Sequence, residues 1–318
     1  MKVLFVGYRD MRHSKFGGYD YIAKFPDADY LDAAKLPFGF IPVGKRGKKL
    51  NLMFLDRIAR LKSVGYNVVH YFYSDFMLFN NFPRKRNCEF VATVHMKSEN
   101  FSSRQIEILK SFDKVVCLSS SEEKNLRNIG INAFFVPHGF NRPVFNNANI
   151  ENFDKNKINL FYSGMNYRDF DAFVKIVDFS NEKELGICFY AVGQSKENKE
   201  KLFLKDNVIV CPRLSDDEYY SLLSLCDYNF LPMTFSTANN ALLEAQSLGV
   251  SSVLPKISGV LDYASEKDNV FYADISELEK LFMKIRKKSA SESLVDFSEK
   301  YAWHEIYKKL AQVYGANK

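Results

Sequence analysis

The sequence predicts an α/β protein with two domains, each built around a parallel β-sheet. Short runs of β-branched and aromatic residues alternate with segments of helical period along most of the chain, which is typical of parallel strands joined by crossover helices. The chain has 318 residues, more than the roughly 250–300 residues that one hydrophobic core usually serves. A polar, Asn-rich interval at 141–157 separates two such series as an interdomain linker would.

Eleven strands are predicted, each a short run rich in β-branched and aromatic residues. In the first half of the chain they span 2–6, 67–71, 89–94, 114–118 and 133–136, with helices at 52–62 and 120–129. In the second half they span 158–162, 187–192, 208–211, 228–231, 251–254 and 270–272. The end of the chain, at 289–314, has helical periodicity and no strand after it.

Two helices of the second half begin at recognisable caps. Ser215 and Glu218 have the spacing of a capping box, so the intervening Asp216 and Asp217 indicate a helix start and not a metal site. Asn239 or Asn240 is expected to cap a helix over 241–248, which ends where Gly249 can adopt a left-handed backbone conformation.

Charge is distributed unevenly along the chain. There are 44 Lys and Arg against 38 Asp and Glu, a net charge of +6. Residues 1–150 hold 23 basic and 13 acidic side chains, a balance of +10, whereas residues 151–318 hold 21 and 25, a balance of −4. The basic half is therefore expected to meet an acidic partner, but no nucleic-acid-binding motif accompanies it, so nucleic acid is not expected.

Composition and motifs exclude several classes of protein. The five cysteines are an odd number without C-x-x-C spacing, which disfavours a disulfide framework and a metal site and indicates a reducing cytoplasm. No P-loop motif occurs, and the interval from Gly7 to Gly17 and Gly18 is too long for a G-x-G-x-x-G dinucleotide turn. No run reaches the ~18 apolar residues of a membrane span, and a strand-like run stands where a signal peptide would. We expect a cytoplasmic protein.

The segment 231–245 carries the clearest functional signal. A strand ends there in a loop rich in Ser, Thr and Asn, and the loop leads into a helix N-terminus. Backbone amides and hydroxyl groups gathered in this way bind phosphate. Glu244 lies on the first turns of the helix, where its carboxylate can accept hydrogen bonds from sugar hydroxyls. An ordinary capped helix with a solvated Glu is the alternative for this segment taken alone.

Several segments, in chain order, are similar to the motifs of one enzyme family. They are Gly17-Gly18 after the first strand, His95 at the end of a strand, the strand and serines of 113–120, Pro137-His138-Gly139 within 136–145, Phe161-Tyr162-Ser163-Gly164, Leu243-Glu244-Ala245 with Gly249, and Trp303 within 297–307. Together they resemble the retaining GT-B glycosyltransferases of glycosyltransferase family 4. The resemblance extends over most of the chain.

The resemblance implies a fold and a division of labour. It implies two Rossmann-like domains that face each other across a cleft. Residues 1–145 would form an acceptor-binding domain, 146–157 a linker, 158–296 a nucleotide-sugar-binding domain, and 297–318 a C-terminal helix that returns toward the first domain. It also implies transfer of a sugar from a nucleotide-sugar with retention of configuration and without a metal or other cofactor.

Roles follow from the matching positions. The catalytic candidates are His95, Arg168 and Ser236. The donor-binding candidates are Gly17, Gly18, Gly164, Arg213, Thr237, Asn239, Asn240, Glu244 and Lys256. On this interpretation Glu244 binds the ribose hydroxyls, the serine, threonine and asparagines surround the diphosphate and sugar, and His95 lies near the donor sugar. A packed structural histidine is the alternative for His95.

Two departures from the family pattern concern catalysis. Ser236 stands where the family often has the first of two glutamates, and Met165 follows Gly164 where the family has a cation. The diphosphate leaving group still needs positive charge. Arg168 is the nearest candidate in sequence, with Arg213 and Lys256 at other strand ends as further candidates.

A basic segment at 35–50 is a candidate membrane or acceptor patch. It combines Phe38 and Phe40 with Lys45, Arg46, Lys48 and Lys49. Apolar residues beside cations favour anionic lipid surfaces, and the Arg84-Lys85-Arg86 run is a possible second contact. A solvated loop is the alternative.

We therefore expect a metal-independent, retaining hexosyltransferase that acts on a glycan or lipid-linked acceptor in the synthesis of cell-surface polysaccharide or glycoconjugate. Its expected location is the cytoplasm, at the inner face of the membrane if the patch binds lipid. The alternatives are a nucleotide-sugar epimerase of the same fold and a non-catalytic nucleotide-sugar-binding protein. The departures at Ser236 and Met165 motivate the second alternative.

Overall fold

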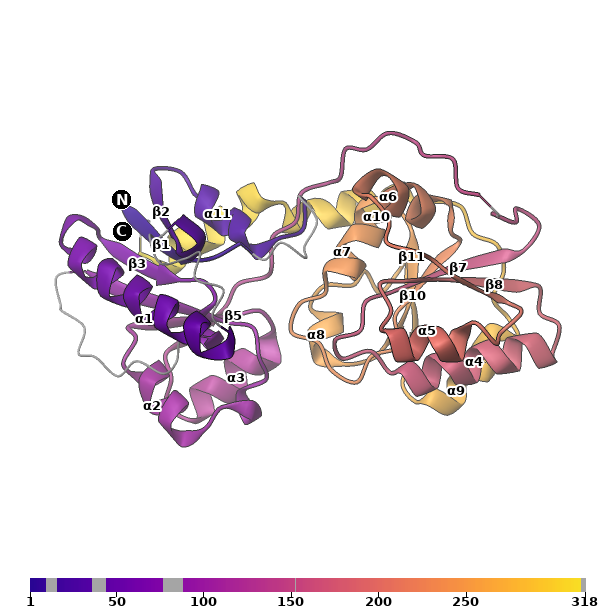
Figure 1. The fold of residues 1–318 in the computed structure, drawn as a ribbon, viewed down its shortest axis with the longest axis horizontal. Coiled ribbons are helices and arrows are strands. Elements are labelled where there is room, and N and C mark those ends of the chain that lie inside the picture. The colour runs from indigo at the N-terminus through magenta and orange to yellow at the C-terminus, as the bar shows by residue number, and fades with distance from the viewer. Residues whose placement is uncertain (10–15, 36–43, 77–87, 152, 316–318) are drawn as a thin grey trace. The chain divides into compact units, whose positions relative to one another are not determined.

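The chain forms two compact units, each with its own sheet (Figure 1). The computed structural model describes residues 1–9, 16–35, 44–76, 88–151 and 153–315. The first unit comprises Met1–Asn141 and Tyr301–Lys318, and the second comprises Arg142–Lys300. Each unit contains a sheet of six parallel strands. The predicted α/β class and the two parallel sheets are therefore confirmed.

The sheet of the first unit has the order β2-β1-β3-β4-β5-β6. Its strands are β1 (Val3–Gly7), β2 (Ala28–Asp32), β3 (Val68–Tyr71), β4 (Glu89–Val94), β5 (Lys114–Cys117) and β6 (Ala133–Phe135). Five of them match predicted strands within about two residues. The sequence did not predict β2, because this edge strand carries Asp29 and Asp32 and has no fully buried residue to mark it.

The helices of the first unit differ from expectation at two places. They are α1 (Gly44–Lys62), α2 (Ser103–Lys110) and α3 (Ser120–Asn128), with 3₁₀ turns η1 (Tyr19–Lys24), η2 (Ala33–Lys35), η3 (Ser63–Gly65), η4 (Ser74–Phe76) and η5 (Ser98–Asn100). The prediction that α1 begins at residue 52 was wrong, because it begins at Gly44. Helix α2 was not predicted, although Ser102 and Gln105 form a capping box at its start.

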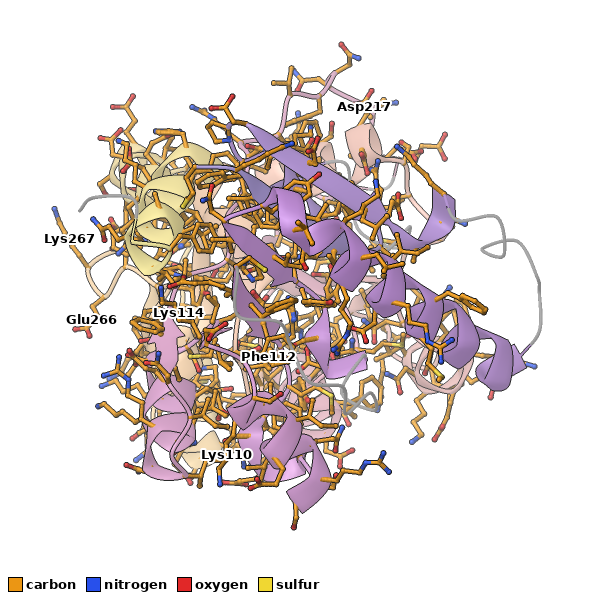
Figure 2. The ribbon with its side chains drawn as sticks, turned by 90° about the vertical axis from the view of Figure 1, so that its left-hand side faces the viewer. Lys110, Phe112, Lys114, Asp217, Glu266 and Lys267 are labelled. Carbon is orange, nitrogen blue, oxygen red and sulfur yellow. The ribbon has the colours of Figure 1, made fainter. Side chains whose placement is uncertain are left out.

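The boundary between core and surface is clear where α2 leads into β5. Lys110 ends the helix and pairs with Glu107 at 3.0 Å on the exposed side. Phe112, two residues later, is buried in the core with Ile108 and Leu109. Figure 2 labels both residues, with Lys110 below Phe112 in the view. This alternation fixes which face of the segment meets the sheet.

The sheet of the second unit has the order β12-β11-β10-β7-β8-β9. Its strands are β7 (Ile158–Ser163), β8 (Ile187–Val192), β9 (Val208–Val210), β10 (Tyr228–Phe230), β11 (Ser251–Pro255) and β12 (Val270–Tyr272). The chain first builds outward from β7 through β8 and β9, and then returns to build outward on the other side from β10. The order of the strands therefore reverses between β7 and β10.

Helices cover both faces of this sheet. They are α4 (Phe170–Glu182), α5 (Lys196–Leu202), α6 (Asp216–Leu225), α7 (Asn240–Ser247), α8 (Ser258–Leu261), α9 (Ile275–Phe282) and α10 (Glu292–Ser298). Within this unit α4, α5 and α9 lie on one face, while α6, α7 and α10 lie on the other (Figure 1). Phe173 and Phe282 belong to the apolar core of the first face, and Leu222 and Ala245 to that of the second.

The end of the chain is helical, as predicted, but it is divided into two helices. Helix α10 packs on α7 of the second unit, whereas α11 (Trp303–Val313) belongs to the first. The turn η6 (Glu299–Tyr301) separates them. The indole of Trp303 covers Gly139, where a Cβ atom would lie only 2.3 Å from the ring. Of the predicted C-terminal segment, Tyr301–Lys318 belongs to the first unit and residues 297–300 belong to the second.

No helix in the part of the chain that the structure describes is both long enough and apolar enough to cross a membrane.

Candidate functional site

Two loops meet at the carboxyl ends of β7 and β10, where the strand order of the second unit reverses. Arg168 and Met233 form an antiparallel bridge between them. The amide of Thr234 donates to the carbonyl of Tyr167 at 3.1 Å, and the amide of Asp169 donates to the carbonyl of Pro232 at 2.9 Å. In open α/β sheets the crevice at such a reversal is where ligands bind.

Glu244 provides a buried carboxylate next to these loops. It lies on α7 and is 7% exposed. The hydroxyl of Tyr219 donates to its Oε2 at 2.7 Å, and the hydroxyl of Tyr220 lies 3.5 Å from its Oε1. Burial raises the pKa of Glu244 to about 7, against the lowering effect of the two tyrosine hydrogen bonds. When ionised, this carboxylate accepts hydrogen bonds from the hydroxyl groups of a ligand.

Arg168 supplies the positive charge of the site. Its Nε donates to the carbonyl of Ser163 at 2.9 Å, and its Nη1 lies 3.5 Å from the carbonyl of Asn166. The guanidinium also borders Gly164, where a Cβ atom would lie 3.5 Å from Nη2 and where φ is +79°. Burial lowers the pKa of Arg168, but a guanidinium titrates so high that it stays cationic at neutral pH.

The N-terminus of α7 forms the third part of the site. Asn239 caps this helix by accepting from the amide of Leu242 at 3.3 Å. Ser236 is 6% exposed, and its hydroxyl has no hydrogen-bond partner among the described residues. Thr237 beside it is also buried, and Asn240 is half-buried at the first helical position. A capped helix N-terminus with an unused hydroxyl in front of it is suited to an anion.

The loop around Ser236 is fixed by a close backbone approach. At Gly259 in α8, an added Cβ atom would lie 1.7 Å from the carbonyl oxygen of Ser236. Only glycine permits this contact, so α8 can press against the loop. The side-chain amide of Asn239 also lies 2.7 Å from the sulfur of Met233. The phosphate-binding candidates therefore lie on a packed loop.

The other two predicted cations lie elsewhere on the sheet. Arg213 is exposed and follows β9, which is the edge strand two places from β7. Lys256 is exposed and follows β11, which is next to β10. Strands in a sheet are spaced about 4.8 Å apart. Of the three candidates, Arg168 is the one that the structure brings into contact with the end of β7.

Three residues of this site were not predicted. Tyr219 and Tyr220 contact Glu244 from α6, and the side-chain amide of Gln194 donates to the carbonyl of Gly164 at 3.1 Å. The cap at Ser215 already places the two tyrosines near the start of α6, at the carboxyl end of the sheet. The two tyrosines could have been predicted from that position. Gln194 could not have been predicted from a local pattern, because its contact follows from the pairing of β7 with β8.

In the first unit, His95 follows β4 and contacts a buried carboxylate. Asp75 accepts from the amide of His95 at 2.8 Å, and its Oδ2 lies 3.2 Å from Nδ1 of the same residue. Gly17 and Gly18 are buried and precede Tyr19, whose ring centroid is 4.7 Å from that of His95. The structure thus brings the glycine pair and His95 together through Tyr19. Asp75 was not predicted.

The predicted membrane or acceptor patch is described only in part. Phe38 and Phe40 lie outside the described residues, as do Arg84, Lys85 and Arg86. Lys45, Arg46, Lys48 and Lys49 lie on the first turns of α1. The alternative of a solvated loop is therefore wrong for Gly44 onward, where the chain is helical.

No group of three or more His, Cys, Asp or Glu side chains arranged to hold a metal ion occurs within the described ranges. Metal independence remains a prediction.

Comparison with known proteins shows similarity in structure but not in sequence. No family model matches the chain, and no curated protein matches it in sequence. Sucrose-phosphate synthase from Thermosynechococcus elongatus superposes with a TM-score of 0.69 at 16% identity, covering 99% of this chain and 88% of that one. The Anabaena protein Alr3699/HepE, solved with UDP and glucose, gives 0.69 at 14% identity, covering 99% and 100%.

A third similar structure is that of the lipopolysaccharide outer core galactosyltransferase WaaB, with a TM-score of 0.69 at 13% identity and complete coverage of both chains. Identities this low establish the fold alone. The two six-stranded parallel sheets and the superposition over nearly the whole chain agree with the expectation from the sequence. The protein has the GT-B fold.

Proposed function

We propose that this protein is a retaining glycosyltransferase that moves a hexose from a nucleotide-sugar to a glycan or lipid-linked acceptor without a metal. One observation carries the proposal. Helix α7 combines an anion site at its N-terminus with the buried carboxylate of Glu244, and both lie where Arg168 folds back on the end of β7. A nucleotide-sugar needs such a set, because it presents hydroxyl groups on either side of a diphosphate.

The binding roles follow from the chemistry of each group. Glu244 accepts hydrogen bonds from the ribose hydroxyls. The hydroxyls of Ser236 and Thr237 and the first amides of α7, at Asn239 and Asn240, surround the diphosphate and the sugar. Arg168 neutralises the charge that develops on the leaving diphosphate. Gly164 leaves space beside this guanidinium. Lys256 adds positive charge from the end of β11, the strand next to β10.

The reaction is a same-face substitution. The acceptor hydroxyl oxygen forms a bond to the anomeric carbon as the bond from that carbon to the phosphate oxygen breaks, and the departing diphosphate takes the hydroxyl proton. No side-chain nucleophile is required, which suits the presence of Ser236 where the resembled family has a glutamate. His95, oriented by Asp75, is assigned to the donor sugar.

Relatives in structure support the substrate class. Alr3699/HepE was solved with UDP and glucose, and TarM was solved with UDP and alpha-GlcNAc-glycerol. We assign the acceptor to the first unit, because the basic excess lies in residues 1–150. An anionic or membrane-linked acceptor, with the chain at the cytoplasmic face, fits that charge.

The test is a thermal-shift screen with UDP-, GDP- and ADP-sugars, followed by turnover of the best binder with glycan and lipid-linked acceptors. We expect one nucleotide series to stabilise the protein and one sugar to be transferred with retained configuration. Glu244→Gln is expected to remove the shift, and Glu266→Gln, on an exposed turn, to preserve it. Binding without transfer to any acceptor would instead indicate a binding protein, and interconversion of the donor sugar would indicate an epimerase.

A further inference from the structure

Tyr219 connects three elements at the proposed donor site. It lies in the first turns of α6, and its hydroxyl reaches Glu244 Oε2 on α7 at 2.7 Å and Ser163 Oγ at the end of β7 at 3.4 Å. A phenol carries one proton, and the shorter contact to the carboxylate is the one that holds it. Tyr219 therefore orients the carboxylate and places it next to the loop that carries Arg168.

Glu244 is faced by charged or titratable groups from α6 and from the loop after β7. Tyr219 and Tyr220 approach from α6 and stabilise the ionised form by hydrogen bonding. Arg168, from the loop after β7, also favours the ionised form, while Asp216 in the first turn of α6 opposes it. The burial of the carboxylate is the largest influence and favours the neutral acid. These opposing effects leave the balance close to neutral pH.

Ionisation decides whether Glu244 can do what the proposed function asks of it. An ionised carboxylate accepts a hydrogen bond on each oxygen, as two neighbouring ribose hydroxyls require. A neutral acid uses one oxygen as a donor and loses part of that capacity. Loss of the hydrogen bond from Tyr219 therefore favours the neutral acid of Glu244 and weakens ligand binding.

We propose that Tyr219 is a positioning residue that keeps the carboxylate of Glu244 oriented and ionised, and that it thereby sets the pH range in which the nucleotide-sugar binds. This inference rests on the proposed function. Tyr219 is assigned no contact with the ligand. It acts through Glu244. The contact with Ser163 holds the hydroxyl of Tyr219 at the end of β7.

The test measures the affinity of UDP-glucose between pH 6 and pH 9. The diphosphate of UDP-glucose is esterified at both ends, so it lacks the ionisation near pH 6 that a terminal phosphate has. A change of affinity between pH 6 and pH 9 therefore does not come from the diphosphate. With a carboxylate pKa of about 7, the wild type should bind about tenfold more weakly at pH 6 than at pH 8. Tyr219→Phe should move this profile to higher pH, so that binding lost at pH 7.5 returns at pH 9. Tyr228→Phe, a buried tyrosine in β10 of the same unit, should leave the profile unchanged.

A second measurement needs no ligand. The side-chain carboxyl of Glu244, followed by carbon-13 NMR in the unliganded protein, should titrate at higher pH in Tyr219→Phe than in the wild type. An unchanged titration, or an affinity lowered equally at every pH, would overturn the positioning role. A shifted titration in a protein that binds no nucleotide-sugar at any pH would overturn the proposed function and confine the role of Tyr219 to Glu244.

Discussion

The Nε atom of Arg168 donates a hydrogen bond to the backbone carbonyl of Ser163, 2.9 Å away and five residues earlier in the chain. This contact returns a cation to the end of β7, although the residue after Gly164 is Met165. Tyr167 makes the return possible, because its positive φ of +57° turns the loop back. The turn of the loop thus brings Arg168 to the end of β7, whereas the resembled family has its cation directly after the glycine.

Replacement of Arg168 by Ala should weaken the binding of UDP by about 10- to 100-fold, because charged hydrogen bonds contribute about 1.5–3 kcal/mol. Uridine lacks phosphate, and its affinity should change little. Isothermal titration with both ligands measures the difference. Lys280→Ala, at an exposed cation of α9 in the same unit, serves as the control. An equal loss for UDP and uridine would show that Arg168 supports the fold of the loop and not the phosphates.

Replacement of Gly259 by Ala should destabilise the second unit by about 1–3 kcal/mol, the usual cost of overpacking. The added methyl group would meet the carbonyl oxygen of Ser236 at 1.7 Å, so either α8 or the loop must move. Urea unfolding measures the stability, and UDP titration should show weaker binding in the same variant. Gly65→Ala, where no atom lies within 4 Å of the added Cβ, is the control. Equal stability of the two variants would contradict the close approach.

The sequence predicted the strands well because they have strong β-propensity and most of them are buried runs. Strands β4, β8 and β12 have the predicted bounds to the residue. Strand β2 was missed because an edge strand with two aspartates lacks that signal. The early start of α1 was missed because residues 44–51 contain two glycines and four basic residues, and Val43 before them is not a residue type that favours the N-cap position.

The candidate site could be predicted where its parts are contiguous in sequence. Ser236, Asn239 and Glu244 lie within nine residues, and the helix that carries them has a readable cap. Tyr219 and Asp75 were missed because each acts on a residue 20 or more positions away. Such contacts depend on sheet order and helix packing, which a local pattern does not encode.

Replacement of Asp75 by Asn should lower kcat for sugar transfer by about tenfold or more, which corresponds to at least ~1.4 kcal/mol of transition-state stabilisation. Asp75 accepts from the backbone amide and Nδ1 of His95 on Oδ2 and from the backbone amide of Met96 on Oδ1. The side chain of Asn has one accepting oxygen, so it cannot reproduce all three contacts. The Kd for UDP should stay unchanged, because the residues proposed to bind the nucleotide belong to the second unit. Steady-state kinetics and titration give both values.

A double-mutant cycle separates orientation from a general loss of structure. If Asp75 acts through His95, adding His95→Gln to Asp75→Asn should cost little more than either change alone. Additive losses would contradict the assignment.

The buried histidine of the first unit makes a prediction about acid stability. His70 is fully buried, with Nδ1 2.5 Å from the hydroxyl of Tyr314 and Nε2 2.6 Å from that of Thr93. Burial lowers its pKa to about 3. In the unfolded chain the imidazole takes up a proton below a pH of about 6.5. Between these values the unfolded state binds more protons than the native state, so the free energy of unfolding must fall as the pH is lowered.

The fall should reach about 1.4 kcal/mol per pH unit below a pH of about 6 from this residue alone. Urea unfolding at several pH values between 5 and 7 measures it, and the fluorescence of Trp303, the one tryptophan of the chain, reports on the first unit that contains it. His70→Gln removes the titrating group and keeps hydrogen-bonding capacity, so its slope with pH should be shallower than that of the wild type. His304→Gln, at an exposed histidine of α11, should keep the wild-type slope. Identical slopes for the two variants would mean that His70 takes up its proton in the folded protein, against the burial that the structure shows.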